Sequence, residues 1–244
     1  GVYVGKHAAD YAVFPSFCDA CLLLNRGSLN IIADRRVINE PDVSKPRYQR
    51  RKEDRPQEIT AAAFDAFAEK GYASTRVEEV ASRAGVSKGL LYLYFKTKEE
   101  LFKAVVKNVV VRRVDALIAL VDKTEQSSEE FIRGPASRFL KDVPDSPVAV
   151  IIRLLISEGP RHPDLLDYYY RNVVSKGLAV VQRILRRGIE RGEFRPSAID
   201  DLPHLFLAPV MMSVVWRSLF GKRSLDTDKL IDTQIDLLLA HIKA

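Results

Sequence analysis

Cysteine is nearly absent from this chain, which has Cys18 and Cys21 among its 244 residues. The two form one C-x-x-C motif, without the second ligand pair that a structural zinc site requires. They also lack the βαβ setting of a thioredoxin-like redox pair. We therefore expect ordinary thiols in a reducing cytoplasm, no bound metal, no cofactor and no catalytic residues.

Long apolar runs are missing as well. Although 47% of the residues are hydrophobic, no run approaches the ~20 apolar residues that a membrane-spanning helix needs. The apolar stretch from Ala12 to Leu24 is interrupted by Asp19 and has no small-residue cleavage site, so a signal peptide is not indicated. We expect a cytoplasmic protein without a membrane partner, in which residues 1–44 form an irregular extension of little functional importance.

No β-hairpin signal appears among the prolines and glycines that punctuate the rest of the chain. Apolar residues recur there at helical spacing instead. The sequence predicts an all-α fold, with a kink where Pro209 lies inside a helix. The helices expected in its later part span residues 98–121, 131–143, 148–157, 164–191, 200–220 and 226–242.

The segment from Thr75 to Lys98, TRVEEVASRAGVSKGLLYLYFKTK, has the pattern of two short helices joined by a tight turn. Thr75 and Glu78 have the spacing of a capping box at the start of the first helix. Gly85 stands where a left-handed residue can end that helix, and Ser87 is a favoured cap for the second. Two helices joined in this way form a unit whose second helix fits the DNA major groove.

The second helix of this unit is expected to turn Leu91 and Phe95 inward and to leave polar and aromatic side chains exposed. Among these, Lys88 can reach base edges such as guanine O6 and N7. Tyr92 and Tyr94 offer hydroxyls to phosphates and ring faces to thymine methyl groups. The alternative is a helical hairpin packed for stability, in which the lysine and the tyrosines are ordinary solvated residues.

Positive charge flanks this unit on both sides. Thr97 and Glu100 form a second capping box, which predicts a helix that begins at Lys98; this lysine and the free amides of the helix start can both hold a phosphate. A basic arm before the first helix is either an electrostatic footprint for DNA or a solvated tail. Its basic residues are Lys45, Arg47, Arg50, Arg51, Lys52 and Arg55.

Residues from about Arg55 to Val105 resemble the DNA-binding domain of the TetR family of bacterial transcriptional regulators. The resemblance lies in ITAAAFDAFAEKGYAST, VEEVASRAGVSKGLLYLYF and KTKEELFKAV. It implies a three-helix DNA-binding domain with its basic arm at residues 45–97. Its third helix would read the major groove, although Leu90 replaces a phosphate-contacting threonine of many members. The predicted DNA-contacting residues are Thr75, Arg76, Ser87, Lys88, Gly89, Leu90, Tyr92, Tyr94 and Lys98.

The same resemblance implies that residues 98–244 form a helical effector-binding and dimerisation domain. The last helix has an apolar stripe, which fits either core packing or a two-fold bundle with a second copy. By resemblance, Ser213–Phe220 and Leu230–Ile242 would form the dimer that reads a palindromic operator in double-stranded DNA. Family members commonly bind a small molecule among the middle helices. Candidate effector-binding residues, for which plain core packing is the alternative, are Phe102, Val106, Leu155, Tyr168, Phe206, Met211 and Trp216.

We therefore expect a homodimeric transcriptional regulator, a repressor that a small-molecule effector releases from DNA. The first alternative is a DNA-binding or DNA-organising protein without an effector. The second is a hydrolase, because Gly85-Val86-Ser87-Lys88-Gly89 satisfies the G-x-S-x-G nucleophile motif. That motif requires a preceding strand, whereas the pattern before Gly85 is helical, so the hydrolase is disfavoured.

Overall fold

The structure is a computed structural model that describes residues 47–221, 223 and 225–244. Over these residues it is helical and has no strand, which confirms the predicted all-α class. One isolated backbone bridge joins Phe194 to Lys243. The expected extension at residues 1–44, with Cys18 and Cys21, and Lys45 of the basic arm lie outside the described residues. No helix in the described part of the chain is long and apolar enough to cross a membrane.

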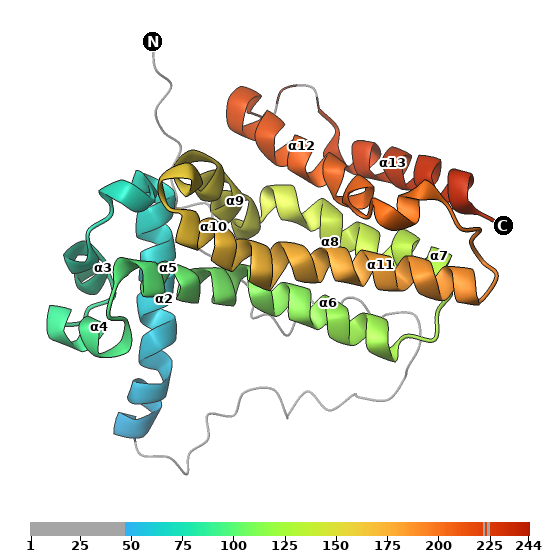
Figure 1. Cartoon of the computed structure of the whole chain (residues 1–244). Helices are drawn as coiled ribbons and strands as arrows, with labels where there is room; N and C mark the ends of the chain where they lie inside the picture. The colour runs from blue at the N-terminus through green and yellow to red at the C-terminus, as the bar shows by residue number, and fades with distance from the viewer. Residues whose placement is uncertain (1–46, 222, 224) are drawn as a thin grey trace.

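The first three helices form a small domain, the head, at one end of the molecule (Figure 1). They are α2 (Arg47–Ser74), α3 (Val77–Arg83) and α4 (Lys88–Tyr94). Helix α2 begins at Arg47, so the segment expected as an arm before the first helix is itself helical from that residue. Its apolar residues recur every three or four positions, which puts them on one face toward α3. The buried core of the head includes Ile59, Ala63, Phe67, Val80 and Leu91.

The end of α2 differs from the sequence prediction. The helix is interrupted at Gly71, whose backbone has a φ of 82° and a ψ of 167°. The Thr75 hydroxyl turns inward and donates hydrogen bonds to the carbonyls of Ala66 and Gly71, at 3.1 and 2.7 Å. The N-cap of α3 is Arg76, whose side chain makes no capping hydrogen bond. The predicted Thr75–Glu78 capping box is therefore wrong, because this hydroxyl closes the end of α2 instead.

The turn between α3 and α4 follows the prediction. Gly85 has a φ of 62°, in the left-handed region that glycine adopts at little cost. The Ser87 hydroxyl accepts a hydrogen bond from the Leu90 amide at 3.1 Å and caps α4. No strand precedes Ser87, since α3 and its turn do so. The nucleophile motif of the hydrolase alternative therefore lacks the setting that it requires.

The remaining helices form the body. The helix predicted from Lys98 begins there, and Thr97 accepts a hydrogen bond from the Glu100 amide at 3.0 Å. The Glu100 carboxylate accepts from the Lys96 amide at 2.7 Å, one residue before the position that a capping box requires.

Three long helices of the body each contain one five-residue π-helical turn. They are α5 (Lys98–Val106), η2 (Lys107–Val111) and α6 (Arg112–Lys123); α7 (Ser128–Phe131), η3 (Ile132–Ala136) and α8 (Ser137–Asp142); and α10 (Pro163–Tyr169), η6 (Tyr170–Val174) and α11 (Ser175–Glu190).

The other body helices are regular or short. Most predicted boundaries lie within a few residues of the observed ones, but the segment expected as one helix over residues 200–220 is divided at Leu202, where φ is −122° and ψ is 57°. The remaining elements are η4 (Val143–Asp145), α9 (Pro147–Glu158), η5 (Gly159–Arg161), η7 (Ala198–Asp201), α12 (His204–Phe220) and α13 (Thr227–Ile242).

Helix α12 continues through Pro209, where the sequence predicted a kink. Proline has no amide proton, so the Leu205 carbonyl one turn earlier loses its helical partner. The Gln234 side chain of α13 donates to that carbonyl at 3.5 Å. A neighbouring helix thus supplies the hydrogen bond that the proline cannot.

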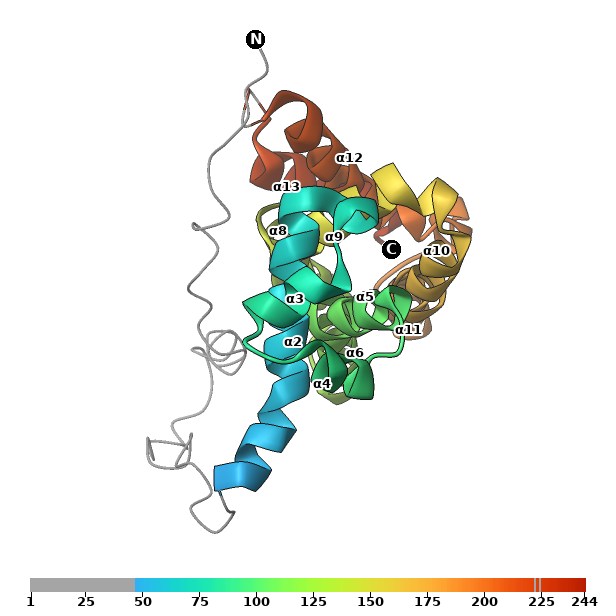
Figure 2. The same ribbon diagram turned by 90° about the vertical axis from the view of Figure 1, so that its left-hand side faces the viewer.

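The body packs as a bundle in which α11 runs beside α6 (Figure 1). Helices α12 and α13 contact each other and lie along one edge, with α13 against α8 and α12 against α9. Figure 2, turned by 90°, views the molecule from the side of the head, with α2, α3 and α4 in front of the body helices. Helix α2 contacts α5 and α9 of the body.

Candidate nucleic-acid interface and ligand cavity

Lys88 lies in the first turn of α4, on the outer surface of the head. Its ammonium forms an ion pair with Glu78 of α3 at 2.5 Å and lies 5.8 Å from the centroid of the Tyr92 ring. The hydrogen bond to Glu78 raises the pKa of Lys88. Both side chains of the pair are more than half exposed. Exposed pairs of this kind contribute little to stability, so Lys88 can exchange Glu78 for another acceptor.

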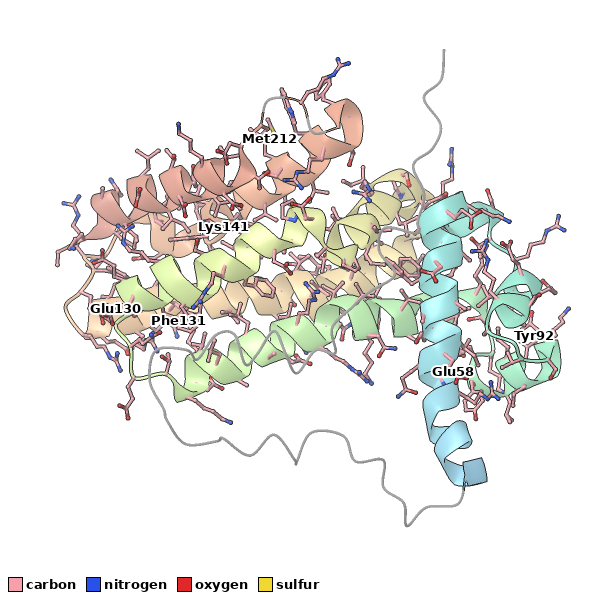
Figure 3. The ribbon with its side chains drawn as sticks, turned by 180° about the vertical axis from the view of Figure 1, so that it is seen from behind. Glu58, Tyr92, Glu130, Phe131, Lys141 and Met212 are labelled. Carbon is pink, nitrogen blue, oxygen red and sulfur yellow. The ribbon has the colours of Figure 1, made fainter. Side chains whose placement is uncertain are left out.

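The rest of the α4 surface combines small, apolar and aromatic groups. Gly89 is exposed, and a Cβ added there would meet no atom within 4 Å, so nothing inside the described chain requires a glycine. Leu93 is 64% exposed, so its side chain lies on the outer surface of the head. Tyr92 and Leu90 are half-buried, and Figure 3 shows Tyr92 on the outer side of the head. Sequence reasoning missed Leu93, although its position two residues after the buried Leu91 places it off the buried face.

Two predicted DNA contacts differ from the surface that the structure presents. Thr75 is 2% exposed and its hydroxyl is bonded within α2, so its side chain does not face solvent. Tyr94 is half-buried and packs against the core of the molecule. Arg76 and Ser87 are exposed, as expected for the outer surface.

The Lys98 side chain is bonded to the backbone of the head and does not extend freely into solvent. Its ammonium donates to the carbonyls of Tyr72, Ala73 and Thr75, at 2.9, 3.0 and 3.2 Å. An ammonium has three donors, and these three carbonyls occupy them all. Burial lowers the pKa of Lys98. Its donors are therefore occupied in this structure, and its contact with a phosphate stays a prediction. The exposed cation nearest in sequence is Lys96.

An aromatic cluster joins the head to the body. The Phe102 ring of α5 lies 5.5 Å from Phe67 and 5.3 Å from Tyr72 of α2, centroid to centroid. His162, at the start of α10, lies 4.7 Å from the Tyr72 ring. Phe102 is 1% exposed and Val106, one turn on, is fully buried. Both were predicted to line an effector site, but neither lines the cavity of the body, and Phe102 packs in the aromatic cluster between the two domains.

The cavity of the body lies further along the bundle. Its volume is about 60 Å³ and its walls are apolar. Helices α6, α8, α11, α12 and α13 and the π-turn η3 line it. The lining residues are Val114, Leu117, Ile132, Ala136, Phe139, Leu140, Gly177, Val180, Val181, Ile184, Phe206, Leu207 and Ile235.

Of the seven predicted effector-binding residues, Phe206 lines this cavity. Leu155 is buried in the core, and Tyr168 lies beside the Lys103 ammonium at 5.6 Å. Met211 is exposed, whereas Trp216 donates to the Arg223 carbonyl and contacts Phe220. The other predicted residues were apolar or aromatic at helical spacing, a pattern that core and surface positions share.

A second hollow, the α6–α11 groove, adjoins the cavity. It has a volume of about 190 Å³ and shares the lining residue Val180 with it. Unlike the cavity, it carries charge: Lys176 is paired with Asp115 at 3.0 Å, and Arg183 is paired with Asp122. Its lining residues are Ile118, Val121, Asp122, Lys176, Ala179, Val180 and Arg183.

Helices α12 and α13 carry exposed large apolar side chains, which we call the outer apolar face. Leu219 is 69% exposed and Leu237 is 64% exposed. Figure 3 labels Met212 on α12. The face consists of Met211, Met212, Leu219, Phe220 and Leu237.

Two family patterns match the chain. The pattern described as "Bacterial regulatory proteins, tetR family" matches residues 59–105, from α2 to the end of α5. The pattern described as "Tetracyclin repressor-like, C-terminal domain" matches residues 133–238, from η3 into α13.

Individual proteins resemble this chain in sequence or in structure over most of its length. The "Fatty acid metabolism regulator protein" of Bacillus subtilis is 25% identical over 194 residues, which cover 78% of this chain and 98% of that protein. A crystal structure described as a TetR-family transcriptional regulator from Mesorhizobium loti has a TM-score of 0.67 at 25% identity, over 82% of this chain and 100% of the other. The fold is also shared with FadR from Bacillus subtilis in complex with stearoyl-CoA, with a TM-score of 0.63 at 21% identity, over 75% and 97% of the two chains.

Proposed function

The chain belongs to the tetR family of bacterial regulatory proteins and is a DNA-binding transcriptional regulator. From this premise we propose that it is a homodimeric repressor, acting in the cytoplasm, which a small molecule releases from a palindromic operator. The observation that carries the proposal is the outer surface of α4. It presents Lys88 in a solvent-exposed ion pair and close to Tyr92, together with the exposed Leu93. The family is one of regulators and not of enzymes.

Each exposed group of this surface has a role in the proposed complex. Lys88 leaves Glu78 and donates to guanine O6 and N7, while Leu93 contacts a thymine methyl group. Gly89 and Ser87 let the start of α4 approach the DNA backbone, and its free amides face a phosphate. The remaining positioning contacts come from Arg76, Lys96 and the two tyrosines, Tyr92 and Tyr94. Leu90 has no polar side-chain group, so its contact is apolar, to a thymine methyl group.

Dimerisation is proposed for the outer apolar face. Monomeric proteins rarely leave large contiguous apolar patches exposed, and such patches mark interaction sites. One head reads one half-site, and a two-fold dimer places two heads about 34 Å apart, one turn of DNA. A second copy packed on α12 and α13 covers this face and supplies the second head.

The effector is proposed to enter the apolar cavity. A typical ligand site has roughly 300–1,000 Å³, and the cavity has about 60 Å³, so the ligand must open it by moving the helices that line it. An effector shifts the population toward the state that it binds better. The opened body then holds the two heads at a spacing that the operator does not fit. The stearoyl-CoA bound by FadR makes a molecule with a long apolar chain the first choice to test.

The first test is a binding titration of the full-length protein on DNA that flanks its own gene. A scrambled duplex serves as the comparison, each at two salt concentrations. Preferential binding to the flanking DNA, with a steep salt dependence, supports a self-regulating operator reader. Equal affinity for both duplexes favours the alternative of an effector-independent DNA-organising protein, and an absence of binding to either contradicts the assignment of this surface.

A further inference from the structure

Two hollows adjoin each other in the body, and only one of them carries charged side chains. The cavity is lined by apolar side chains, while the α6–α11 groove carries Lys176, Arg183 and Asp122. Val180 lies between them and contributes to both walls. A molecule that occupied both would therefore place an apolar part in one and a charged part in the other.

The sign of that charged part follows from the side chains of the groove. Lys176 and Arg183 come from α11, and both of their carboxylate partners, Asp115 and Asp122, come from α6. The side chains of both pairs are between 38 and 61% exposed, so solvent screens them and little stability is lost when they separate. When α6 and α11 move apart around a ligand, the two cations separate from these partners and their donors become available to an anion. A carboxylate or phosphate accepts from such donors, and it bonds a guanidinium through two parallel hydrogen bonds.

A third cation lies one turn beyond Arg183 on the same helix. The guanidinium of Arg187 donates from Nε to the Ser128 hydroxyl at 3.2 Å and from Nη1 to the Val121 carbonyl at 3.5 Å. Its Nη2 is buried and has no hydrogen-bond partner in the described part of the chain. A buried donor without a partner is costly. The guanidinium is tied to the groove through Val121, whose carbonyl accepts from Nη1 and which also lines the groove.

A glycine, Gly177, lies in the wall of the apolar cavity. Gly177 of α11 lines the cavity, and a Cβ added there would meet no atom within 4 Å. Glycine inside a helix costs roughly 0.5–1 kcal/mol relative to alanine. The empty space beside Gly177 therefore remains available to an apolar chain, and a large side chain introduced at this position would fill it.

We propose that the α6–α11 groove is the head-group end of the effector site, so that the effector is an amphipathic anion. Its apolar chain lies in the cavity, and its carboxylate or phosphate bonds Lys176 and Arg183 in place of Asp115 and Asp122. This proposal rests on the proposed function, because binding at this site is what releases DNA. The groove adds the sign of the ligand's charge and the residues that recognise it.

Four ten-carbon probes test the proposal on the full-length protein: decanoate, decyl phosphate, decanol and decylamine. Their affinities are measured by titration calorimetry below the concentrations at which they form micelles, and DNA release is followed by fluorescence anisotropy of a labelled operator. A hydrogen bond to a charged group contributes about 1.5–3 kcal/mol, so at least one anion should bind roughly ten-fold or more tightly than decanol. Stronger binding of decanoate identifies a free acid, and stronger binding of decyl phosphate identifies a phosphate ester.

Two variants separate the two ends of the site. The double variant K176Q/R183Q should bind the better anion no more tightly than decanol, with decanol affinity unchanged. Gly177→Leu should weaken all four probes. Arg171→Gln, an exposed arginine paired within its own helix segment, is the matched control and should leave every affinity unchanged.

Several results would overturn the inference. These are equal binding of decanol and both anions, retention of the anion preference in K176Q/R183Q, or no binding of either anion. If decanol alone releases the operator, the head-group assignment fails while the proposed repressor stands. If the protein without any probe does not distinguish its operator from a scrambled duplex, the proposed function fails, whatever the probes bind.

Discussion

Two lysines ten residues apart, one in the head and one at the start of the body, differ in their surroundings, and we propose different roles for them. Lys88 is exposed and shares a screened ion pair with Glu78, so its ammonium is free to bond a base. Lys98 is held by three carbonyls at the end of α2, so its ammonium maintains the fold. The two residues are of the same type, but the donors of the Lys88 ammonium are accessible to solvent and those of the Lys98 ammonium are occupied by carbonyls.

We expect Lys88→Ala to weaken operator binding roughly 5- to 150-fold and to relax specificity at one base-pair position. The reason is loss of a bidentate contact to a guanine edge. Binding of the variant to a set of single-base operator variants measures this. Lys123→Ala, at the exposed end of α6, is the control and should leave the preference intact. An unchanged base preference in the Lys88 variant would contradict the assignment.

We expect Lys98→Met to destabilise the fold by about 1–3 kcal/mol, because carbonyls at the end of α2 lose their donor. The salt dependence of DNA binding should not change. Lys96→Met should do the reverse, with stability within about 0.5 kcal/mol of the parent and a salt slope smaller by about one. Denaturant unfolding and titrations at several salt concentrations check both. A smaller salt slope for Lys98→Met would restore the phosphate contact predicted from the sequence.

At the scale of helices and turns, local chemistry was readable from the sequence wherever it depended on a few neighbouring residues. Gly85, the Ser87 cap and the start of α5 at Lys98 belong to this group. The direction of Lys98 was not readable, because it depends on the end of α2 more than twenty residues earlier. The same applies to Gln234, which compensates Pro209 from another helix.

The Ser87 cap gives a prediction at this scale. Loss of an N-cap hydroxyl typically costs about 0.5–2 kcal/mol, so Ser87→Ala should unfold at lower denaturant concentration and also bind the operator less tightly. Ser87→Asp should retain the stability, because aspartate caps equally well. It should still bind DNA weakly, because its carboxylate repels the phosphates. Equal stability of Ser87→Ala and the parent would show that α4 does not depend on this cap.

At the scale of the whole molecule, the sequence predicted the division into a head and a helical body, but not most of the residues around the cavity. A cavity lies where several helices fail to fill the space between them, and helical spacing within one segment does not report that. Met211 was predicted to line the effector site, yet its side chain is 43% exposed. In the proposed dimer a second copy of the chain covers such a side chain, and the pattern of a single sequence does not report that contact.

The outer apolar face provides the corresponding test. Leu219→Glu places a charge in the proposed dimer interface, where it would have to lose its water. We expect a monomer in sedimentation experiments and loss of most operator affinity, since one head then binds one half-site. Leu202→Glu, an exposed leucine outside α12 and α13, is the control and should remain dimeric. A Leu219→Glu variant that stays dimeric would place the interface elsewhere.

The π-turn η2 has a consequence for anyone who combines parts of such proteins. It lies inside the helix that passes from the head to the body, between α5 and α6, and a turn of this kind holds one residue more than an α-helical turn. One residue corresponds to about 100° of rotation around a helix axis. A hybrid in which the same number of residues replaced Lys107–Val111 as ordinary α-helix would therefore rotate the head by about 100° relative to the body. Hybrid regulators built from this chain should keep η2 whole and be joined elsewhere.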